Sequence, residues 1–401
     1  MTNEVKNVPE LRFPGFEDEW KINLFGELVT NKSDKYLPKN NEQLIDIELD
    51  SIESNTGRLI HKYNSSHFSS QKHKFNKNQV LYSKLRPYLN KYYFTNFNGV
   101  CSSEIWVLNT KSDLKLINEF IYNFIQTNKF SQIANKSAGS KMPRADWNLV
   151  ENIRFNIPIL KEQEKIGSFF SKLDRQIELE EQKLEKLEEQ KKGYMQKIFS
   201  QELRFKDESG EGYPEWEEKK LGDVATIVGG GTPNTKIAEY WNGDINWFSP
   251  VEIGNDIFVN ESKNRITELG LKKSSAKLLP TGTVLFTSRA GIGKTAILNS
   301  EACTNQGFQS IVPNQSMLDS YYIYSKTNQL KKYAEIVGSG STFIEVSGVQ
   351  MRKMPIMLPS ITEQEKIGAF FKNIDEMIDK QNQKIDRLKE RKQGFLQKMF
   401  V

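Results

Sequence analysis

The stretch EQEKIGSFFSKLDRQIELEEQKLEKLEEQKKGYMQKIF, residues 162–199, occurs a second time as EQEKIGAFFKNIDEMIDKQNQKIDRLKERKQGFLQKMF at residues 363–400. The two copies align without a gap at an offset of 201 residues, and 19 of the 38 positions are identical. Because the chain has 401 residues, this period indicates two copies of one large unit rather than an array of small repeats.

Apolar residues recur in each copy at alternating steps of four and three, which is the pattern of a coiled-coil seam. The seam runs from Ile166 to Ile198 in the first copy and from Ile367 to Met399 in the second. A proline shortly precedes each copy and none interrupts it, so a helix is expected to start there. At about 1.5 Å per residue, each helix is expected to be roughly 57 Å long.

A helix with one apolar seam needs a partner of matching length, and the other copy is the obvious one. An antiparallel register with Glu180 opposite Lys392 also places Lys191 opposite Gln381, so both polar layers of the seam would be paired. The alternative is that each helix pairs with a helix of another chain. The residues expected at the centre of the pair are Ile177, Glu180, Leu184, Leu187, Lys191, Ile378, Gln381, Ile385, Leu388 and Lys392.

Each long helix is preceded by β-branched and aromatic runs separated by Gly, Pro, Asn and Ser, which favours short strands with some helix. The fold class is therefore expected to be α+β. Two mixed α/β globular domains would be joined by two long helices in an antiparallel coiled coil, with an internal pseudo-two-fold repeat. The expected division is 1–160 for the first domain with its N-terminal segment, 161–200 for the first helix, 201–215 for a linker, 216–360 for the second domain and 361–401 for the second helix.

The composition, with 37% hydrophobic and 27% charged residues, is that of a soluble protein. No apolar run approaches the roughly 18 residues that span a bilayer, and the N-terminus lacks the core of a secretory signal, so a cytoplasmic location is expected. Cys101 and Cys303 occupy nearly equivalent places, which favours two buried free thiols over a disulfide.

The basic excess lies mainly in the first domain. Residues 20–160 hold 19 Lys and Arg against 12 Asp and Glu, a net charge of +7, whereas residues 216–360 hold 15 against 13, a net charge of +2. This bias permits nucleic-acid binding, although ordinary solvated surface explains it equally well.

Several motifs that suggest catalysis fail on their spacing. The string Ala290-Gly291-Ile292-Gly293-Lys294-Thr295 looks like the end of a phosphate-binding loop, but Ser288 stands where the first Gly is required and the following residues predict a strand. The run Gly229-Gly230-Gly231 lacks dinucleotide-binding spacing, and either close backbone approach to a large partner or an ordinary turn explains it. The three histidines favour roles other than metal binding. We find no pattern of a nucleophilic triad, a nuclease or a methyltransferase, so a binding role is expected.

The order of segments resembles a known family. A Leu-Arg-Phe segment, a variable domain and an EQEKIG-type helix ending in Lys-Gly-aromatic, all repeated once, are similar to the specificity (S) subunit of type I restriction-modification enzymes. The strongest carriers of the resemblance are residues 162–166 and 363–367 together with the segments at 11–13 and 203–205. The likeness covers essentially the whole chain.

The resemblance implies that each globular part is a target recognition domain that reads one half of a split, asymmetric site in double-stranded DNA. It also implies that two methyltransferase (M) subunits dock on or near the helices, with restriction (R) subunits in the full complex and no membrane. The chain itself would be non-catalytic and hold no cofactor. S-adenosylmethionine would belong to the M subunits, and ATP with Mg²⁺ to the R subunits.

A basic turn follows a strand at matching places in both domains, and Arg or Lys there suits phosphate or guanine contacts. By position on expected loops, the DNA-contacting residues are Lys32, Ser33, Lys35, Lys84, Arg86, Tyr88, Thr232, Asn234, Lys236, Ser288, Arg289 and Lys294. Two rival functions are a coiled-coil adaptor that binds only proteins and a nucleotide-hydrolysing enzyme that relies on Lys294.

Overall fold

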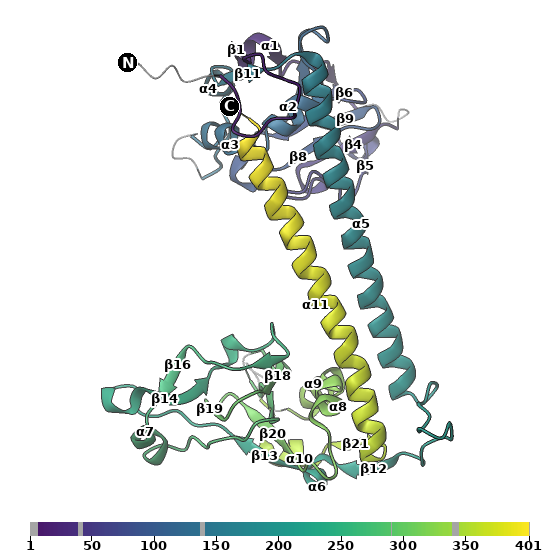
Figure 1. Ribbon diagram of the computed structural model, residues 1–401, viewed down its shortest axis with the longest axis vertical. Helices are drawn as coiled ribbons and strands as arrows, with labels where there is room; N and C mark the ends of the chain where they lie inside the picture. Colours follow the sequence, from purple (N-terminus) through teal and green to yellow (C-terminus); the bar gives the residue numbers. More distant parts are fainter. Residues whose placement is uncertain (1–6, 39–42, 137–140, 290, 339–344, 401) are drawn as a thin grey trace. The chain divides into compact units, whose positions relative to one another are not determined.

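The computed structural model describes residues 7–38, 43–136, 141–289, 291–338 and 345–400 (Figure 1). The chain divides into two compact units, residues 1–182 with 382–401, and residues 183–381. Each unit contains one globular domain, the beginning of the long helix that follows that domain, and the end of the other long helix. Within the described ranges, no helix is both long enough and apolar enough to cross a membrane.

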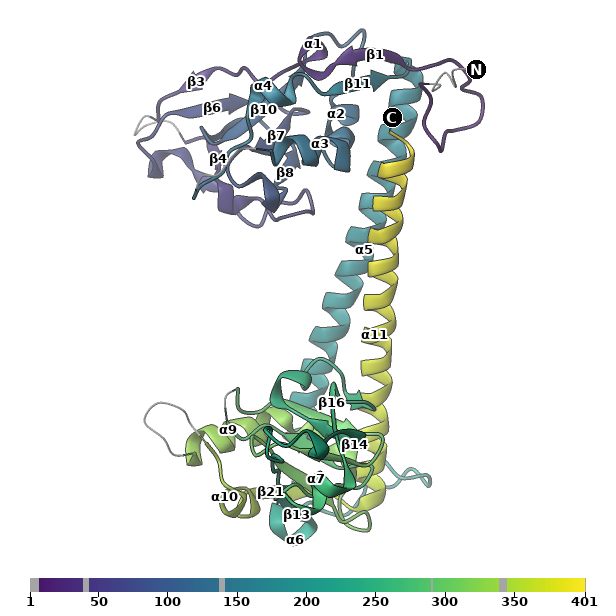
Figure 2. The ribbon, with the colours of Figure 1, turned by 90° about the vertical axis from the view of Figure 1, so that its left-hand side faces the viewer.

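The first unit contains two sheets that follow the orders β2-β10-β7-β8 and β3-β6-β9-β4-β5, and a two-stranded ribbon, β1-β11. In Figure 2, β3, β6 and β4 lie at the side of this unit away from α5. The strands are β1 Lys21–Leu24, β2 Val29–Thr30, β3 Lys35–Tyr36, β4 Ile45–Ile47, β5 Tyr63–Asn64, β6 Lys72–Phe75, β7 Val80–Ser83, β8 Tyr92–Phe94, β9 Gly99–Ser102, β10 Ile105–Thr110 and β11 Arg154–Ile157. The helices are α1 Phe25–Leu28, α2 Asn118–Phe124, α3 Asn128–Ala134, α4 Trp147–Val150 and α5 Leu160–Phe199, with short 3₁₀ turns η1 Leu49–Ser51, η2 Ser65–His67 and η3 Pro87–Leu89.

The second unit has sheets with the orders β13-β20-β17-β18-β15 and β16-β14-β19, and a ribbon, β12-β21. Its strands are β12 Glu217–Lys220, β13 Ala225–Gly229, β14 Trp241–Phe248, β15 Phe258–Val259, β16 Asn264–Ile266, β17 Val284–Phe286, β18 Thr295–Leu298, β19 Ala302–Thr304, β20 Gln309–Pro313 and β21 Pro355–Leu358. Its helices are α6 Leu221–Val224, α7 Glu268–Lys272, α8 Ser320–Ser325, α9 Thr327–Val337, α10 Gly348–Arg352 and α11 Ile361–Lys398, with 3₁₀ turns η4 Ala238–Tyr240 and η5 Pro250–Glu252.

The two units are built on the same frame. In each, the first strand pairs antiparallel with the last one, as β1 with β11 and β12 with β21, and the long helix follows directly. In each, the strand that holds the cysteine pairs parallel with an earlier strand, as β9 with β4 and β19 with β14. Cys101 and Cys303 are both free and buried, which confirms the expectation from the sequence.

The core of each unit receives the end of the long helix that belongs to the other repeat. Phe400 packs against Trp20, Phe120 and Phe124 in the first unit. Phe199 packs in the same way against Tyr322 and Phe371 in the second. The apolar end of each repeated stretch is therefore an anchor in a domain core, which explains why both copies end in an aliphatic residue followed by phenylalanine.

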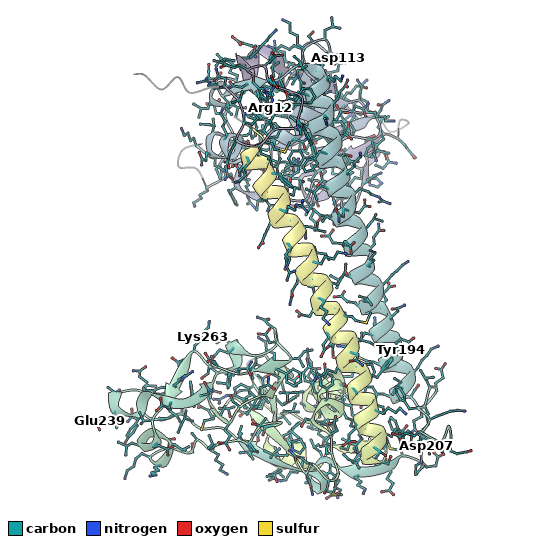
Figure 3. The ribbon with its side chains drawn as sticks, in the orientation of Figure 1. Arg12, Asp113, Tyr194, Asp207, Glu239 and Lys263 are labelled. Atoms are coloured by element: carbon teal, nitrogen blue, oxygen red, sulfur yellow. The ribbon has the colours of Figure 1, made fainter. Side chains whose placement is uncertain are left out.

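The repeated Glu-Gln pair ties the start of each long helix to its domain. Glu162 is buried and forms an ion pair with Arg12, with Arg12 Nε 2.8 Å from Glu162 Oε1. The matching Glu363 is buried and binds Arg204 at 3.0 Å (Nη2 to Oε2). A buried carboxylate is costly without a cationic partner, so the two Leu-Arg-Phe segments neutralise the two helix starts; Figure 3 labels Arg12.

The glutamine that follows completes this attachment. The side-chain amide of Gln163 donates to the carbonyls of Pro158 and Lys115, each at 2.9 Å, and its oxygen accepts the N–H of Ile117 at 3.1 Å. Gln364 makes the corresponding three hydrogen bonds in the second unit, each at 3.0 Å. The two identical copies of Glu-Gln thus serve a structural purpose.

α5 and α11 pack side by side in each unit, as Figure 1 illustrates for each end of α5. In the first unit Leu173 and Ile177 form an apolar cluster with Leu388. Lys392 lies beside it, with Nζ 2.6 Å from Asp174 Oδ1. In the second unit the equivalent Lys191 lies 2.5 Å from Asp375. The two lysines that interrupt the seam are therefore satisfied by equivalent aspartates, each one residue beyond a seam position.

The expected register of the helix pair is wrong. Lys392 pairs with Asp174 rather than with Glu180, and Lys191 pairs with Asp375 rather than with Gln381. Glu180 is buried and pairs with Lys384 at 3.0 Å. The shift from position 180 to 174 is six residues, or about 9 Å along a helix. It arises because the cationic seam residues find their counter-charges on the flank of the seam instead of within it.

The fold class itself is confirmed: two mixed α/β domains carry two long helices in antiparallel pairing, and each repeat begins with a strand, a short helix and a strand and ends with three short helices, a strand and the long helix. The bounds of α5 and α11, Leu160–Phe199 and Ile361–Lys398, match the repeated stretches within two residues.

Candidate nucleic-acid interface

The turn after β7 presents two of the expected DNA-contacting residues at the surface. Arg86 is exposed and adopts a left-handed backbone with φ of 51°, and Asn90 at the far end of the turn has φ of 47°. Tyr88 between them is 59% exposed. Lys84, which precedes the turn, is half-buried, and its N–H donates to the carbonyl of Glu104 at 3.0 Å.

The second expected group in this unit lies on the segment that runs into β3. Lys32 and Lys35 are exposed, and Lys35 pairs with His73 of β6. Ser33 is half-buried, and its hydroxyl is shielded from solvent. The two lysines therefore present charge at the surface near the edge of the β3-β6-β9-β4-β5 sheet, whereas Ser33 presents little of its side chain.

In the second unit, the loop after β13 holds three expected residues. Lys236 and Asn234 are exposed, and the side-chain oxygen of Asn234 accepts the N–H of Lys236 at 3.0 Å. The hydroxyl of Thr232 donates to the side-chain oxygen of Gln306. The loop is therefore ordered by its own polar side chains, and Lys236 supplies its cationic charge.

Two of the three glycines before this loop, Gly230 and Gly231, approach the chain's own backbone. A Cβ at Gly230 would lie 1.9 Å from the carbonyl oxygen of Asn305, and a Cβ at Gly231 would lie 2.3 Å from the amide nitrogen of Ala276. Close backbone approach was one of the two expected explanations, but the neighbour is this domain rather than a large partner.

The turn after β17 differs from its counterpart in the first unit. Ser288 is fully buried, so its side chain does not reach the surface where DNA would contact it. Arg289 is half-buried and Lys294 is exposed. Ala290 lies outside the described residues. Gly291 and Gly293 have φ of 102° and 91°, so glycines make this turn where the first unit uses residues with side chains.

Lys294 does not belong to a phosphate-binding loop. The residue after it begins β18 (Thr295–Leu298), whereas a phosphate-binding loop requires a helix at this point. The expected strand is therefore confirmed. The backbone N–H of Lys294 donates to the hydroxyl of Thr287 at 2.9 Å, and this hydrogen bond closes the turn.

Two of the three histidines, His61 and His73, contact polar groups of the protein. His73 Nδ1 lies 3.2 Å from the carbonyl oxygen of Ile105, and His61 Nε2 lies 3.6 Å from Asp50 Oδ1. Among the described residues, no group of three or more His, Cys, Asp and Glu side chains is arranged to hold a metal ion.

One buried ion pair lies beneath the first domain's surface. Lys72 is 1% exposed, and its Nζ lies 3.0 Å from Asp46 Oδ2 and contacts Glu48. Burial raises the pKa of Asp46, and Lys72 partly offsets this effect. The sequence gives no signal for this pair, because the two residues are 26 positions apart on strands β4 and β6.

A cleft of about 1530 Å³ opens in the first unit beside Tyr88. One wall belongs to the globular domain and the other to α5 and α11. The domain wall includes residues that the sequence did not single out: Asn55, Arg58, Lys62, Asn90, Asn96 and Asn128. They come from loops and helices far apart in the chain, so only the fold brings them together.

Comparisons with known proteins agree with this architecture. The family described as "Type I restriction modification DNA specificity domain" matches residues 17–189 and again residues 213–390. The Type I restriction enzyme MjaIX specificity subunit of Methanocaldococcus jannaschii is 37% identical over 197 residues, which cover 47% of this chain and 46% of that protein. The chain thus spans about half the length of this relative.

A longer match is the Type I restriction enzyme HindI specificity subunit of Haemophilus influenzae, 22% identical over 76% of this chain and 82% of that protein. The solved structure of a type I restriction-modification system S subunit from M. genitalium superposes with a TM-score of 0.58 at 15% identity. The superposition covers 98% of this chain and 99% of the S subunit from M. genitalium, and it supports the fold. Since the family match covers most of both repeats, this chain belongs to the type I restriction-modification DNA specificity family.

Proposed function

We propose that this chain is the DNA-specificity subunit of a type I restriction-modification complex and recognises a bipartite, asymmetric DNA site with one domain per half-site. The observation that carries the proposal is the double family match, once in each globular domain and its helix. Two domains with one frame and different surface loops suit two different half-sequences. The exposed cationic residues Arg86, Lys35, Lys236 and Lys294 supply candidate contacts.

The chain is proposed to act without catalysis or a cofactor of its own. Methyltransferase subunits would dock on or near α5 and α11 and bring S-adenosylmethionine, and restriction subunits would bring ATP and Mg²⁺. Support comes from the surface of the helices, where charged residues such as Glu185, Lys186 and Glu189 are exposed while the apolar seam is turned inward. Such a surface remains available to a partner after the two helices have paired.

The proposal is tested by selecting bound sequences from a pool of random duplexes with the full chain and its methyltransferase subunits. We expect a motif of two short defined halves separated by a fixed undefined spacer. Arg86→Ala should weaken binding by about 1–3 kcal/mol and relax one half only, and Arg289→Ala should relax the other half. A protein-binding adaptor predicts no enriched motif, and that outcome would refute the proposal.

A further inference from the structure

The turn of residues 86–90 is fixed in a conformation that residues with side chains rarely adopt. Arg86 and Asn90 are left-handed, with φ of 51° and 47°, and flank the single 3₁₀ turn Pro87–Leu89. Asn55 on the neighbouring loop is also left-handed, with φ of 64°. Such backbone strain persists only where the surrounding structure imposes it, and it is concentrated at functional sites.

Hydrogen bonds impose this conformation and join the two loops. The N–H of Arg86 donates to the carbonyl of Pro143 at 2.8 Å. The N–H of Asn55 donates to the carbonyl of Asn90 at 3.0 Å, and the side-chain amide of Asn90 donates to Asn55 Oδ1 at 3.0 Å. The turn and the loop of residues 54–62 are therefore one rigid element that holds Tyr88 out toward solvent.

The cleft beside Tyr88 has charged groups on both walls. The helix wall, from α5 and α11, supplies both carboxylates and cations: Asp174, Glu178, Glu390, Arg175, Lys389 and Lys392. The domain wall has no carboxylate among its lining residues, and its two cations are Lys62 and Arg58, of which Arg58 pairs with Glu181 of α5. Lys62 is exposed, and its Nζ lies 4.2 Å from the centre of the Phe97 ring, so Lys62 is the cation that this wall presents to solvent.

The domain wall therefore combines an exposed lysine, side-chain amides and an exposed aromatic ring on two loops that hydrogen bonds join. Cations bind phosphates, amides bind base edges, and aromatic rings contact sugars and bases. We propose that residues 54–62 and 86–90 form one surface that contacts duplex DNA, with Lys62 on a phosphate and Tyr88 against the duplex. This inference rests on the proposed function and adds the 54–62 loop to the residues that read the first half-site.

The second domain lacks this surface at the equivalent place. Its turn is built with Gly291 and Gly293, and no aromatic residue stands at the position of Tyr88 among residues 288–289 and 291–294. The contact is therefore specific to one half of the site. This asymmetry supplies an internal control, because the second half-site should not respond to changes in the 54–62 loop.

The test uses the full chain in complex with its methyltransferase subunits and a duplex that carries the selected site. Tyr88→Ala should raise Kd roughly tenfold, and Lys62→Ala should lower the slope of log K against log salt by about 1. Tyr88→Phe, which keeps the ring, should retain most of the affinity. Lys77→Ala, an exposed lysine on the β6–β7 turn outside the cleft, should behave as the wild type.

Hydroxyl-radical footprinting should show loss of protection in one half-site for Tyr88→Ala and unchanged protection in the other. Wild-type affinity, salt slope and protection in both variants would overturn the inference while leaving the proposed function intact. Weaker binding of methyltransferase subunits in the absence of DNA, measured by size-exclusion chromatography, would overturn it in favour of a protein-docking cleft. If the wild-type complex binds no defined sequence, both the inference and the proposed function fail.

Discussion

Lys392 should be the residue on which the helix pairing in the first unit depends most. Its side chain is 7% exposed, and its Nζ contacts Asp174 Oδ1 at 2.6 Å and Gln126 Oε1 at 2.8 Å. Lys392→Met would keep the volume and remove the charge, leaving both oxygens without their donor. Burial already raises the pKa of Asp174 against the opposing effect of Lys392, so removal of the lysine should raise that pKa further.

Breaking a buried ion pair costs about 3–5 kcal/mol, and Asp174 is one-third exposed, so we expect Lys392→Met to destabilise the pairing by about 2–3 kcal/mol. The double variant Lys392→Met/Asp174→Leu should recover most of this loss, because it leaves no unpaired charge. Lys191→Met is the matched control. Lys191 is 27% exposed, and in the variant its partner Asp375 would still accept a hydrogen bond from the hydroxyl of Tyr321, at 2.7 Å. We therefore expect a smaller destabilisation, about 1–2 kcal/mol.

Native-state hydrogen exchange of α5 amides in residues 170–180 measures this directly, because opening of the pair sets their exchange rates. An unchanged exchange rate in Lys392→Met would refute the assigned role. Additive effects of Lys392→Met and Asp174→Leu would show that the two residues do not act as a pair.

Three further predictions concern single contacts. Burial lowers the pKa of Lys326 to about 8, below its value of about 10.4 in the unfolded chain. Between these two pH values the unfolded chain binds more protons than the folded chain, so the free energy of unfolding should rise with pH across that window. Thermal unfolding should show this rise in the wild type, and an equal rise in Lys326→Gln would contradict the prediction. Glu162→Gln should weaken the contact of Arg12 with the start of α5 by about 1–3 kcal/mol and so speed the hydrogen exchange of residues 11–13. Exchange at the wild-type rate would show that Glu162 does not hold this segment in place. Gly230→Ala should lower the melting temperature, because the new Cβ would lie 1.9 Å from a backbone oxygen. Gly212→Ala should leave the melting temperature unchanged, because no heavy atom lies within 4 Å of the new Cβ. Equal melting temperatures of the two variants would contradict the prediction.

The long helices could be predicted because the signal for them is local. A heptad seam and the absence of proline define a helix from the sequence alone, and α5 and α11 follow the repeated stretches closely. Their register could not be predicted, because it depends on Asp174 and Asp375, which lie outside the seam. Seam positions alone place Lys392 opposite Glu180, whereas its partner Asp174 lies beside the seam.

The candidate interface was predicted less completely for the same reason. Position on a loop correctly placed Arg86 and Tyr88 at the surface, but it also selected Ser288, whose side chain is completely buried. Lys62 and Asn55, which belong to the proposed surface, were not selected from the sequence, since the loop that holds them is joined to the turn of Tyr88 by hydrogen bonds between residues more than 30 positions apart. Exposure and contacts between distant loops follow from tertiary packing, which local patterns do not specify.

We propose above all that two unlike domains on one chain read two halves of one DNA site. Sequencing of N6-methyladenine in the genome of cells that express this chain with its methyltransferase subunit tests it most directly. We expect methylation confined to a split motif, two defined halves with a constant spacer, that is absent from cells lacking this chain. Absence of methylation, or methylation at a continuous motif without a spacer, would contradict the claim.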